Sequence, residues 1–183
     1  MNKITKGLII LVVFSTCSSC LVLNDSQTPI QKLNQENFQN INGTYVAPID
    51  TFVDWTLPDL LILEYQSKYG KFGYEDFVTC KLQMIDECNL EIIVFKNGEI
   101  ETGFKVKGEL KDGYFYFKPQ KYVESYFGIL LRIPEKKLTR IGLTLDNKMI
   151  VDSEIRVTSS MFLIRGRHYY DEYYGYKFDK EAK

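Results

Sequence analysis

The feature that most constrains the fold is a long series of alternating segments, which begins near residue 76 and runs almost to the end of the chain. Apolar and polar residues alternate along 77–85, 102–110 and 138–145, with the period of a strand that has one buried face. Asn97-Gly98 is typical of a tight type I′ hairpin turn. Because a helix does not keep a period of two residues, the chain is predicted to be mainly β.

The spacing of these segments favours a closed antiparallel sheet. About eight or nine strands follow one another at spacings of about 8–12 residues, a pattern typical of an antiparallel sandwich or barrel. We expect strands at 77–85, 90–96, 102–110, 114–119, 122–133, 138–145, 148–153, 159–166 and 173–179. Since short hairpins join successive strands, the simplest topology is a single up-and-down barrel, with a turn at Pro134.

One segment ahead of this series is predicted to be helical. Within residues 56–65, Thr56 is suited to cap a helix, and Pro58 and Asp59 are suited to its first turn. Leucine side chains recur on one face of the same segment. We therefore expect an all-β barrel of about eight or nine strands with one short helix near 56–65.

The beginning of the chain is typical of a secretion signal. Lys3 and Lys6 precede an apolar run at 7–14, which matches the apolar region of a signal peptide and is too short for a permanent membrane span. Cys17 and Cys20 stand where a cleavage site of small residues would follow. A redox or zinc pair fits this position less well, because neither a βαβ pattern nor a second pair of ligands accompanies it.

This arrangement resembles the bacterial lipoprotein signal, in which a peptidase cuts before a diacylated cysteine. That pattern has an apolar residue three positions before the cysteine and a small residue directly before it. Cys17 has Phe14 and Thr16 at these positions, whereas Cys20 has Cys17 and Ser19. The resemblance favours Cys17 as the lipid-attachment residue, with Cys20 as the alternative. It implies a protein of the bacterial cell envelope, held at a membrane by acyl chains and periplasm-facing by default.

The same signals divide the chain into four parts. Residues 1–16 (or 1–19) form a removed signal peptide, 17–40 a lipidated N-terminus with a flexible tether, 41–179 the β-barrel domain and 180–183 a polar tail. Residues 1–19 contain two lysines and no acids, so their removal changes 23 basic and 24 acidic residues to 21 and 24. This balance argues against a nucleic-acid partner.

The order of elements resembles that of small lipocalin-like lipoproteins of Bacteroidetes-type bacteria. Asn42-Gly43-Thr44-Tyr45, a short helix and a strand meander follow one another in that order. Lipocalins carry Gly-x-Trp in the first strand and an arginine near the last strands that packs over the tryptophan. The resemblance implies a closed barrel with a cavity, in which Gly43 and Tyr45 occupy the motif and Arg165 is the barrel-closing partner of Tyr45.

Two further cysteines, Cys80 and Cys88, would face an oxidising compartment after export, which leaves a disulfide open. Cys80 is in phase with Val78 and Leu82, so it is predicted to be a core thiol. A tight turn at Asp86-Glu87 would not pair the two cysteines. The sequence therefore favours free thiols over a bond.

Catalytic and cofactor motifs are not evident in the sequence. His168 is the single histidine, in a polar stretch, and is more consistent with a surface or packing role than with a general base. Asp50, Asp54, Asp171 and Glu172 carry carboxylates outside any acid–base signature. We expect no enzyme activity, no metal and no cofactor.

The most unusual local feature is an aromatic C-terminal segment, which contains Tyr169, Tyr170, Tyr173, Tyr174 and Tyr176. As a structural element it is a closing strand with Tyr174, Tyr176 and Phe178 on one side. As an interaction element it would present tyrosines to an envelope protein or a glycan. Two functions stay open: binding of a small apolar ligand in the barrel, and an interaction module that uses exposed tyrosines.

Overall fold

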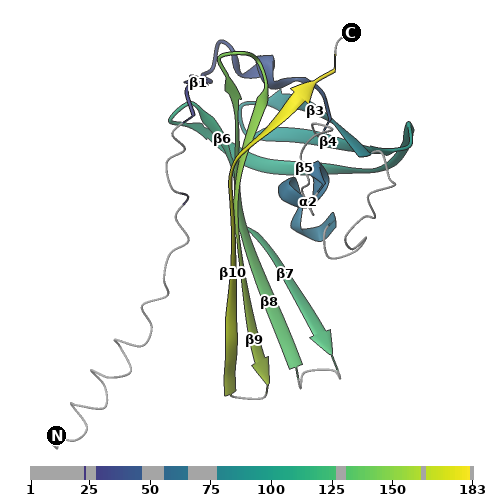
Figure 1. Ribbon diagram of the computed structural model, residues 1–183, viewed down its shortest axis with the longest axis vertical. Helices are drawn as coiled ribbons and strands as arrows, with labels where there is room; N and C mark the ends of the chain where they lie inside the picture. The colour runs from purple at the N-terminus through teal and green to yellow at the C-terminus, as the bar shows by residue number, and fades with distance from the viewer. Residues whose placement is uncertain are drawn as a thin grey trace, which may run out of the picture.

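The computed structural model describes residues 23, 28–46, 56–65, 78–126, 131–161 and 164–181 (Figure 1). Within the strands, it leaves the side chains of 124–126, 131–133, 158–161 and 164–170 outside this description. The strands are β1 (Ile30–Gln31), β2 (Gly43–Val46), β3 (Val78–Asp86), β4 (Asn89–Lys96), β5 (Glu99–Lys111), β6 (Tyr114–Phe117), β7 (Gln120–Tyr126), β8 (Leu131–Thr144), β9 (Met149–Met161) and β10 (Ile164–Lys180). Two short helices, η1 (Phe38–Ile41) and α2 (Leu57–Leu61), are also described, and residues 63–65 are helical as well.

Eight of the strands form a closed antiparallel barrel, as the sequence predicts. They follow the order β8-β6-β5-β4-β3-β2-β10-β9, and the pairing of β8 with β9 closes the ring. Asn97 and Gly98 have φ angles of 52° and 84°, and Asp112 and Gly113 of 51° and 86°. The predicted hairpin turn at Asn97-Gly98 is therefore confirmed, since a type I′ turn needs two positive φ angles in succession, and Asp112-Gly113 forms a second turn with the same pattern.

The last three strands are longer than the sequence pattern predicts. We expected two separate short strands at 148–153 and 159–166, whereas residues 149–153 and 159–161 belong to the single strand β9 and residues 164–166 to the start of β10. Pro134 is not at a turn, because it lies inside β8 and pairs with Val123. The ladder from β8 to β9 passes over Ile133 and Pro134, so the missing N–H of the proline is tolerated there.

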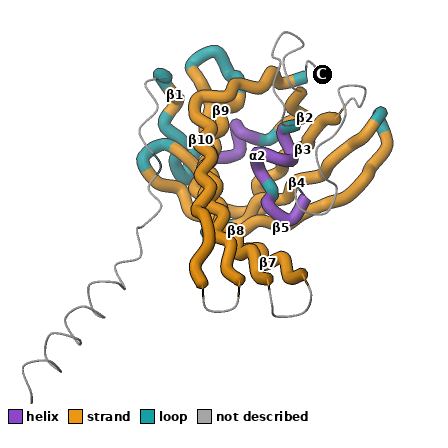
Figure 2. Tube along the Cα trace, turned by 60° about the horizontal axis from the view of Figure 1, so that its bottom comes forward, coloured by secondary structure: helices purple, strands orange, loops and turns teal. Residues whose placement is uncertain are grey.

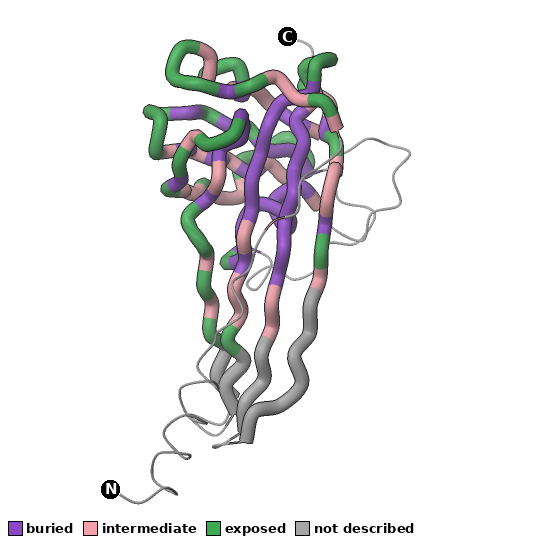
Figure 3. The backbone as a smooth tube through the Cα atoms, turned by 90° about the vertical axis from the view of Figure 1, so that its left-hand side faces the viewer, coloured by how far each residue is buried: buried purple, intermediate pink, exposed green. Residues whose placement is uncertain are grey.

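The extra length of these strands builds a sheet that projects from the barrel (Figure 1). We call this projecting sheet the stalk; it consists of β7 with residues 131–137 of β8, 155–161 of β9 and 164–171 of β10. Buried residues are concentrated in the barrel portion of the long strands (Figure 3). The stalk therefore extends beyond the core that stabilises the barrel.

Two boundaries of the predicted domain need correction. Ile30 and Gln31 pair with β8, and Leu33 belongs to the hydrophobic core, so the described part of the predicted 17–40 tether packs on the barrel. At the other end, Lys180 is the last residue of β10 and pairs with Tyr45. The backbone N–H of Glu181 donates to Thr44 at 2.9 Å. The predicted polar tail thus contributes to the seam between β2 and β10.

A buried ion pair joins β8 to β9 beside the barrel core. Arg140 Nε donates to Asp152 Oδ2 at 2.8 Å, and the two side chains are 1% and 0% exposed. The guanidinium also donates to Tyr116 Oη at 2.9 Å and lies 4.3 Å from the ring centre of Tyr114. The backbone N–H of Gly175 donates to the second carboxylate oxygen of Asp152 at 2.8 Å. One carboxylate therefore ties β10 to the pair of β8 and β9.

Replacement of one partner of this pair should strongly destabilise the barrel. Asp152→Ala leaves a buried guanidinium without its counterion, so we expect the free energy of unfolding to fall by about 3–5 kcal/mol. The double variant Arg140→Met/Asp152→Leu should recover most of that loss, because it removes both charges. Urea unfolding of the full chain in neutral detergent measures both changes.

Asp179→Ala is the matched control, because Asp179 pairs with Lys148 at 2.8 Å on the surface, where both side chains are about half exposed. This variant should lose much less stability than Asp152→Ala. An equal loss in the two single variants would contradict the importance of the buried pair.

Candidate functional site

The interior of the barrel is occupied by α2, which lies inside the ring of strands (Figure 2) and packs against β3 and β9. Leu57, Leu60 and Leu61 are at most 1% exposed. The backbone N–H of Thr56 donates to Asp59 Oδ2 at 2.8 Å, and its hydroxyl donates to the same oxygen at 2.5 Å. The predicted helix start at Thr56 is therefore confirmed; α2 ends at Leu61, and residues 63–65 are helical again, so the predicted helical span of 56–65 is interrupted at Ile62.

Three side chains from β7 and β8, at the base of the stalk, bind the last carbonyl groups of α2. Lys137 Nζ donates to the carbonyl of Asp59. Gln120 Nε2 donates to that of Leu61 at 2.7 Å, and the Thr139 hydroxyl donates to that of Leu60 at 3.4 Å. The last carbonyls of a helix have no partner within the helix, so these contacts supply the donors that the buried end needs. We call Gln120, Lys137 and Thr139 the plug donors.

Sequence analysis missed Lys137, although it is the most unusual polar residue of the interior. Its side chain is fully buried. Burial lowers the pKa of its ammonium group to about 7, although the carboxylates of Asp59 and Glu135 oppose this change. The only sequence signal is its phase, since Lys137 falls on the same strand face as Thr139 and Ile141.

Other titratable groups lie around the same helix. Tyr65 donates to Glu101 Oε2 at 2.6 Å, and burial together with this bond raises the pKa of its hydroxyl. Burial, and secondarily the carboxylate of Asp59, raises the pKa of the Cys80 thiol. These shifts favour the neutral thiol and phenol at neutral pH, so neither group is activated as a nucleophile.

The described interior is filled by the side chains of the barrel and of α2. Tyr45, Tyr65, Phe115 and Ile141 are each 0% exposed, and the core also contains buried leucine and valine side chains from β3 and β4. Two cavities that described residues line both lie outside this core. One, of about 370 Å³, lies between residues 33–35, the β3–β4 turn and the end of β5. The other, of about 230 Å³, is on the stalk, where Lys121, Lys136 and Arg156 are among its lining residues.

The pairing of the strands does not bring Tyr45 and Arg165, the expected pair, together. Tyr45 is buried and donates to the carbonyl of Ile41 at 2.7 Å. Its partner on β10 is Lys180, whose ammonium lies 5.8 Å from the centre of the tyrosine ring. Arg165 pairs with Ser160 at the opposite end of β10. A cation does accompany the aromatic residue of the first barrel strand, but Lys180 supplies it.

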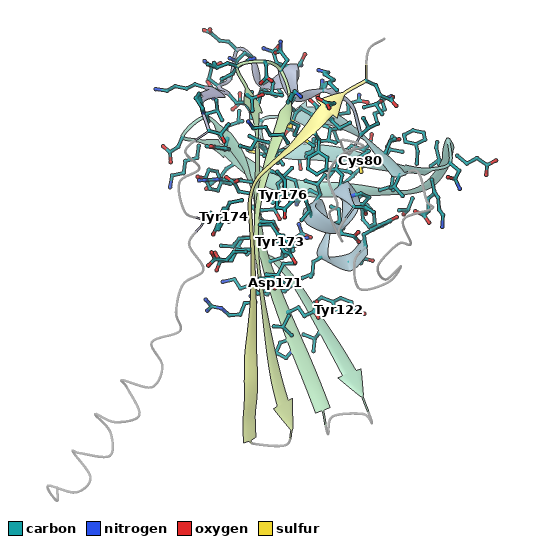
Figure 4. The ribbon with its side chains drawn as sticks, in the orientation of Figure 1. Cys80, Tyr122, Asp171, Tyr173, Tyr174 and Tyr176 are labelled. Carbon is teal, nitrogen blue, oxygen red and sulfur yellow. The ribbon has the colours of Figure 1, made fainter. Side chains whose placement is uncertain are left out.

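The cysteines of the barrel are both free thiols. Cys80 is buried in the barrel, in agreement with its predicted phase (Figure 4). Cys88 is exposed at the β3–β4 turn, where its backbone N–H donates to Asp86 Oδ1 at 2.7 Å. The two thiols are therefore separated by most of β3, which accounts for the absence of a bond between them.

The tyrosines of the C-terminal strand divide between two sides of β10. Tyr173 and Tyr176 belong to the core or pack against it, with ring centres 6.1 Å apart. Tyr174 lies on the other side of the strand (Figure 4). Our expectation that Tyr174 shares a side with Tyr176 and Phe178 is wrong, because the register shifts between Tyr173 and Tyr176. Gly175, with a φ of 71°, allows this irregularity.

For several of the predicted residues, the side chain or the whole residue lies outside the described part of the structure. Tyr169 and Tyr170 pair with Val157 and Arg156 in the stalk, and His168 pairs with Thr158, but their side chains are outside the described part. Cys17 and Cys20 lie outside the described residues altogether. Among the side chains that are described, no cluster of three His, Cys, Asp or Glu residues is placed to hold a metal ion.

Comparison with known proteins finds no matching family model, no matching curated protein and no matching solved structure. Across the described ranges, none of the helices has the length and apolar character that a membrane crossing would require. Functional inference for this chain therefore depends on its own geometry.

Lys137 should make the stability of the barrel depend on pH. Above pH 7 the folded state loses the Lys137 proton, whereas an unfolded lysine keeps it until about pH 10.4. The unfolded state then binds more protons, so stability should rise with pH from about 7 upward, by at most about 1.4 kcal/mol per unit.

Urea unfolding at pH 7.0 and 8.5 measures this slope. Lys137→Met should flatten it relative to the unmodified chain, whereas Lys105→Met, at an exposed position of β5, should not. The comparison cancels the opposing effect of Cys80, which is present in every variant. Parallel slopes in the unmodified chain and Lys137→Met would show that the lysine titrates normally in the fold.

Proposed function

We propose that this chain is a lipid-anchored protein of the bacterial cell envelope, which acts by binding and uses the stalk as its binding surface. The observation that carries the proposal is the continuation of β8, β9 and β10 beyond the barrel, where β7 joins them in a four-stranded sheet (Figure 1). Closure of an eight-stranded barrel does not need this length.

The interior of the barrel supports this choice over a ligand inside the barrel. A pocket for a small molecule is a cavity of several hundred Å³, whereas α2 and the core side chains occupy the described interior. Entry of an apolar ligand would require the removal of α2 and the loss of its contacts with the plug donors. The described tyrosines give less support to an aromatic patch, because Tyr173 and Tyr176 pack in or on the core.

The position of the N-terminal segment is consistent with a stalk that is free to bind. Ile30 pairs with Thr144 at the barrel end of β8, whereas the stalk contains the opposite end, which begins at Leu131. A tether from Cys17 or Cys20 therefore joins the fold at the end farther from the stalk tip. The point where the N-terminal segment joins the fold and the proposed binding surface therefore lie at opposite ends of β8.

Hydrogen exchange tests the stalk as the binding surface. In its own envelope membranes, the full chain should exchange more slowly at 120–126 and 131–137 than in neutral detergent, because a bound component covers these strands. Val123 and Ile85 are 54% and 51% exposed, so Val123→Asp should abolish the protection and Ile85→Asp should preserve it. Protection confined to the barrel strands, or none, would overturn the proposal.

Mass spectrometry of the intact, membrane-extracted chain tests the anchor. Cys17→Ala should lose the mass of the acyl chains, and Cys20→Ala should retain it, because the resemblance to the lipoprotein signal favours Cys17. The reverse result would assign the lipid to Cys20. Retention of the acyl mass in the double variant Cys17→Ala/Cys20→Ala would exclude acylation at either cysteine.

A further inference from the structure

The cavity on the stalk is lined by three cationic residues from three neighbouring strands. Lys121 of β7 pairs directly with Lys136 of β8, and Lys136 pairs with Arg156 of β9. All three residues line the cavity of about 230 Å³. We call Lys121, Lys136 and Arg156 the cationic row.

Such a row is unfavourable in the absence of an anion. Like charges directly opposite each other on one face of a sheet destabilise it. In the adjacent row Glu154 pairs with Glu172 on the barrel side of Arg156, so among the described side chains of this face the acidic residues lie next to the Arg156 end of the cationic row. The two lysines lie at the other end, on β7 and β8.

Among the described residues that line the cavity one is acidic, Glu135, and it belongs to the other face of the sheet from the lysines. Glu135 is next to Lys136 in β8, so the alternation of the strand directs its side chain to the opposite face. On that face its carboxylate acts on Lys137, whose pKa it raises against the effect of burial. The cavity therefore combines cationic side chains with no acidic side chain from its own face of β8.

Apolar groups form another part of the cavity wall. Val123, exposed on β7, pairs with Pro134 of β8, and both residues line the cavity beside the lysines. The aliphatic stems of lysine and arginine add to such a wall while their charged ends reach solvent. The site thus offers cationic ends around a small apolar depression.

We infer that this cavity binds an anionic group, phosphate or carboxylate, that is carried on an apolar body. The inference rests on the proposed function, because it assigns a ligand chemistry to the stalk. The volume is slightly below the range of about 300–1,000 Å³ of drug-sized pockets, which fits a head group and the first carbons of a chain. The same chemistry occurs in a diffusible amphiphile and in the head group of an anionic lipid.

Calorimetric titration of the full chain in neutral detergent with hexyl phosphate tests this site. Hexyl phosphate should bind, and hexyl glucoside, which has the same chain without a charge, should not. Lys121→Gln/Lys136→Gln should weaken binding about tenfold or more, since charge-assisted hydrogen bonds are lost. Lys105→Gln/Lys107→Gln removes the same charge from exposed positions of β5 and should leave the affinity unchanged.

Val123→Ser tests the apolar wall of the cavity separately from the lysines. It should weaken hexyl phosphate severalfold and leave inorganic phosphate unchanged, because only the alkyl chain contacts the apolar wall. Equal binding of hexyl glucoside, or equal losses in the two double-lysine variants, would overturn the inference. Unfolding curves of Val123→Ser and Lys105→Gln/Lys107→Gln should coincide with that of the unmodified chain, since the replaced side chains are exposed. Lys121→Gln/Lys136→Gln should be at least as stable, because it removes a pair of like charges.

Lipid nanodiscs distinguish the two sources of the ligand. If the protein binds discs that contain phosphatidylglycerol more strongly than phosphatidylcholine discs, the ligand is a lipid head group. If it binds both kinds of disc equally but does bind hexyl phosphate, the ligand is a diffusible amphiphile. Binding of neither probe overturns the inference. If stalk protection in envelope membranes persists in that case, the stalk binds another component and the proposed function stands.

Discussion

An eight-stranded barrel must fill its own interior, and in this protein α2 provides part of the filling. A ring of eight strands is just wide enough for side chains from the wall to meet. Inserting a helix there buries leucine side chains, but it also brings backbone carbonyls into a region without water. The plug donors satisfy those carbonyls from β7 and β8. The apolar filling of the barrel therefore depends on three polar contacts.

These contacts couple the barrel to the stalk. Gln120 is the first residue of β7 and makes two hydrogen bonds at the end of α2. Its Nε2 donates to the carbonyl of Leu61, and its Oε1 accepts from the N–H of Leu63, just after the helix, at 2.8 Å. Gln120 and Lys137 are cross-strand partners, so the position where the stalk begins is also the position where α2 ends. Displacement of α2 would remove hydrogen bonds from the base of the stalk.

The hairpin turn and the helix start could be predicted because they depend on local chemistry, whereas the long-range arrangement of the strands could not. Asn97-Gly98 and Thr56 act within a few residues, so the sequence alone determines what they do. The length of β8 to β10 could not be predicted, because a period of two residues looks the same in a barrel and in a projecting sheet. Tyr174 was misplaced because the irregularity at Gly175 shifts the alternation by a residue. Lys137 was missed because its partner is a backbone carbonyl of α2, far from it in sequence.

The edges of the stalk favour binding through its face. Among the described residues of the stalk, β7 pairs only with β8 and β10 only with β9, so both outer strands have backbone groups to which another strand could be added. Charged residues are frequent on both, among them Lys121 and Glu124 on β7 and Asp171 on β10. Charges on an edge strand oppose such addition. Because its edges are protected in this way, the stalk is expected to bind a partner through its face. The cationic row lies on that face and lines its cavity.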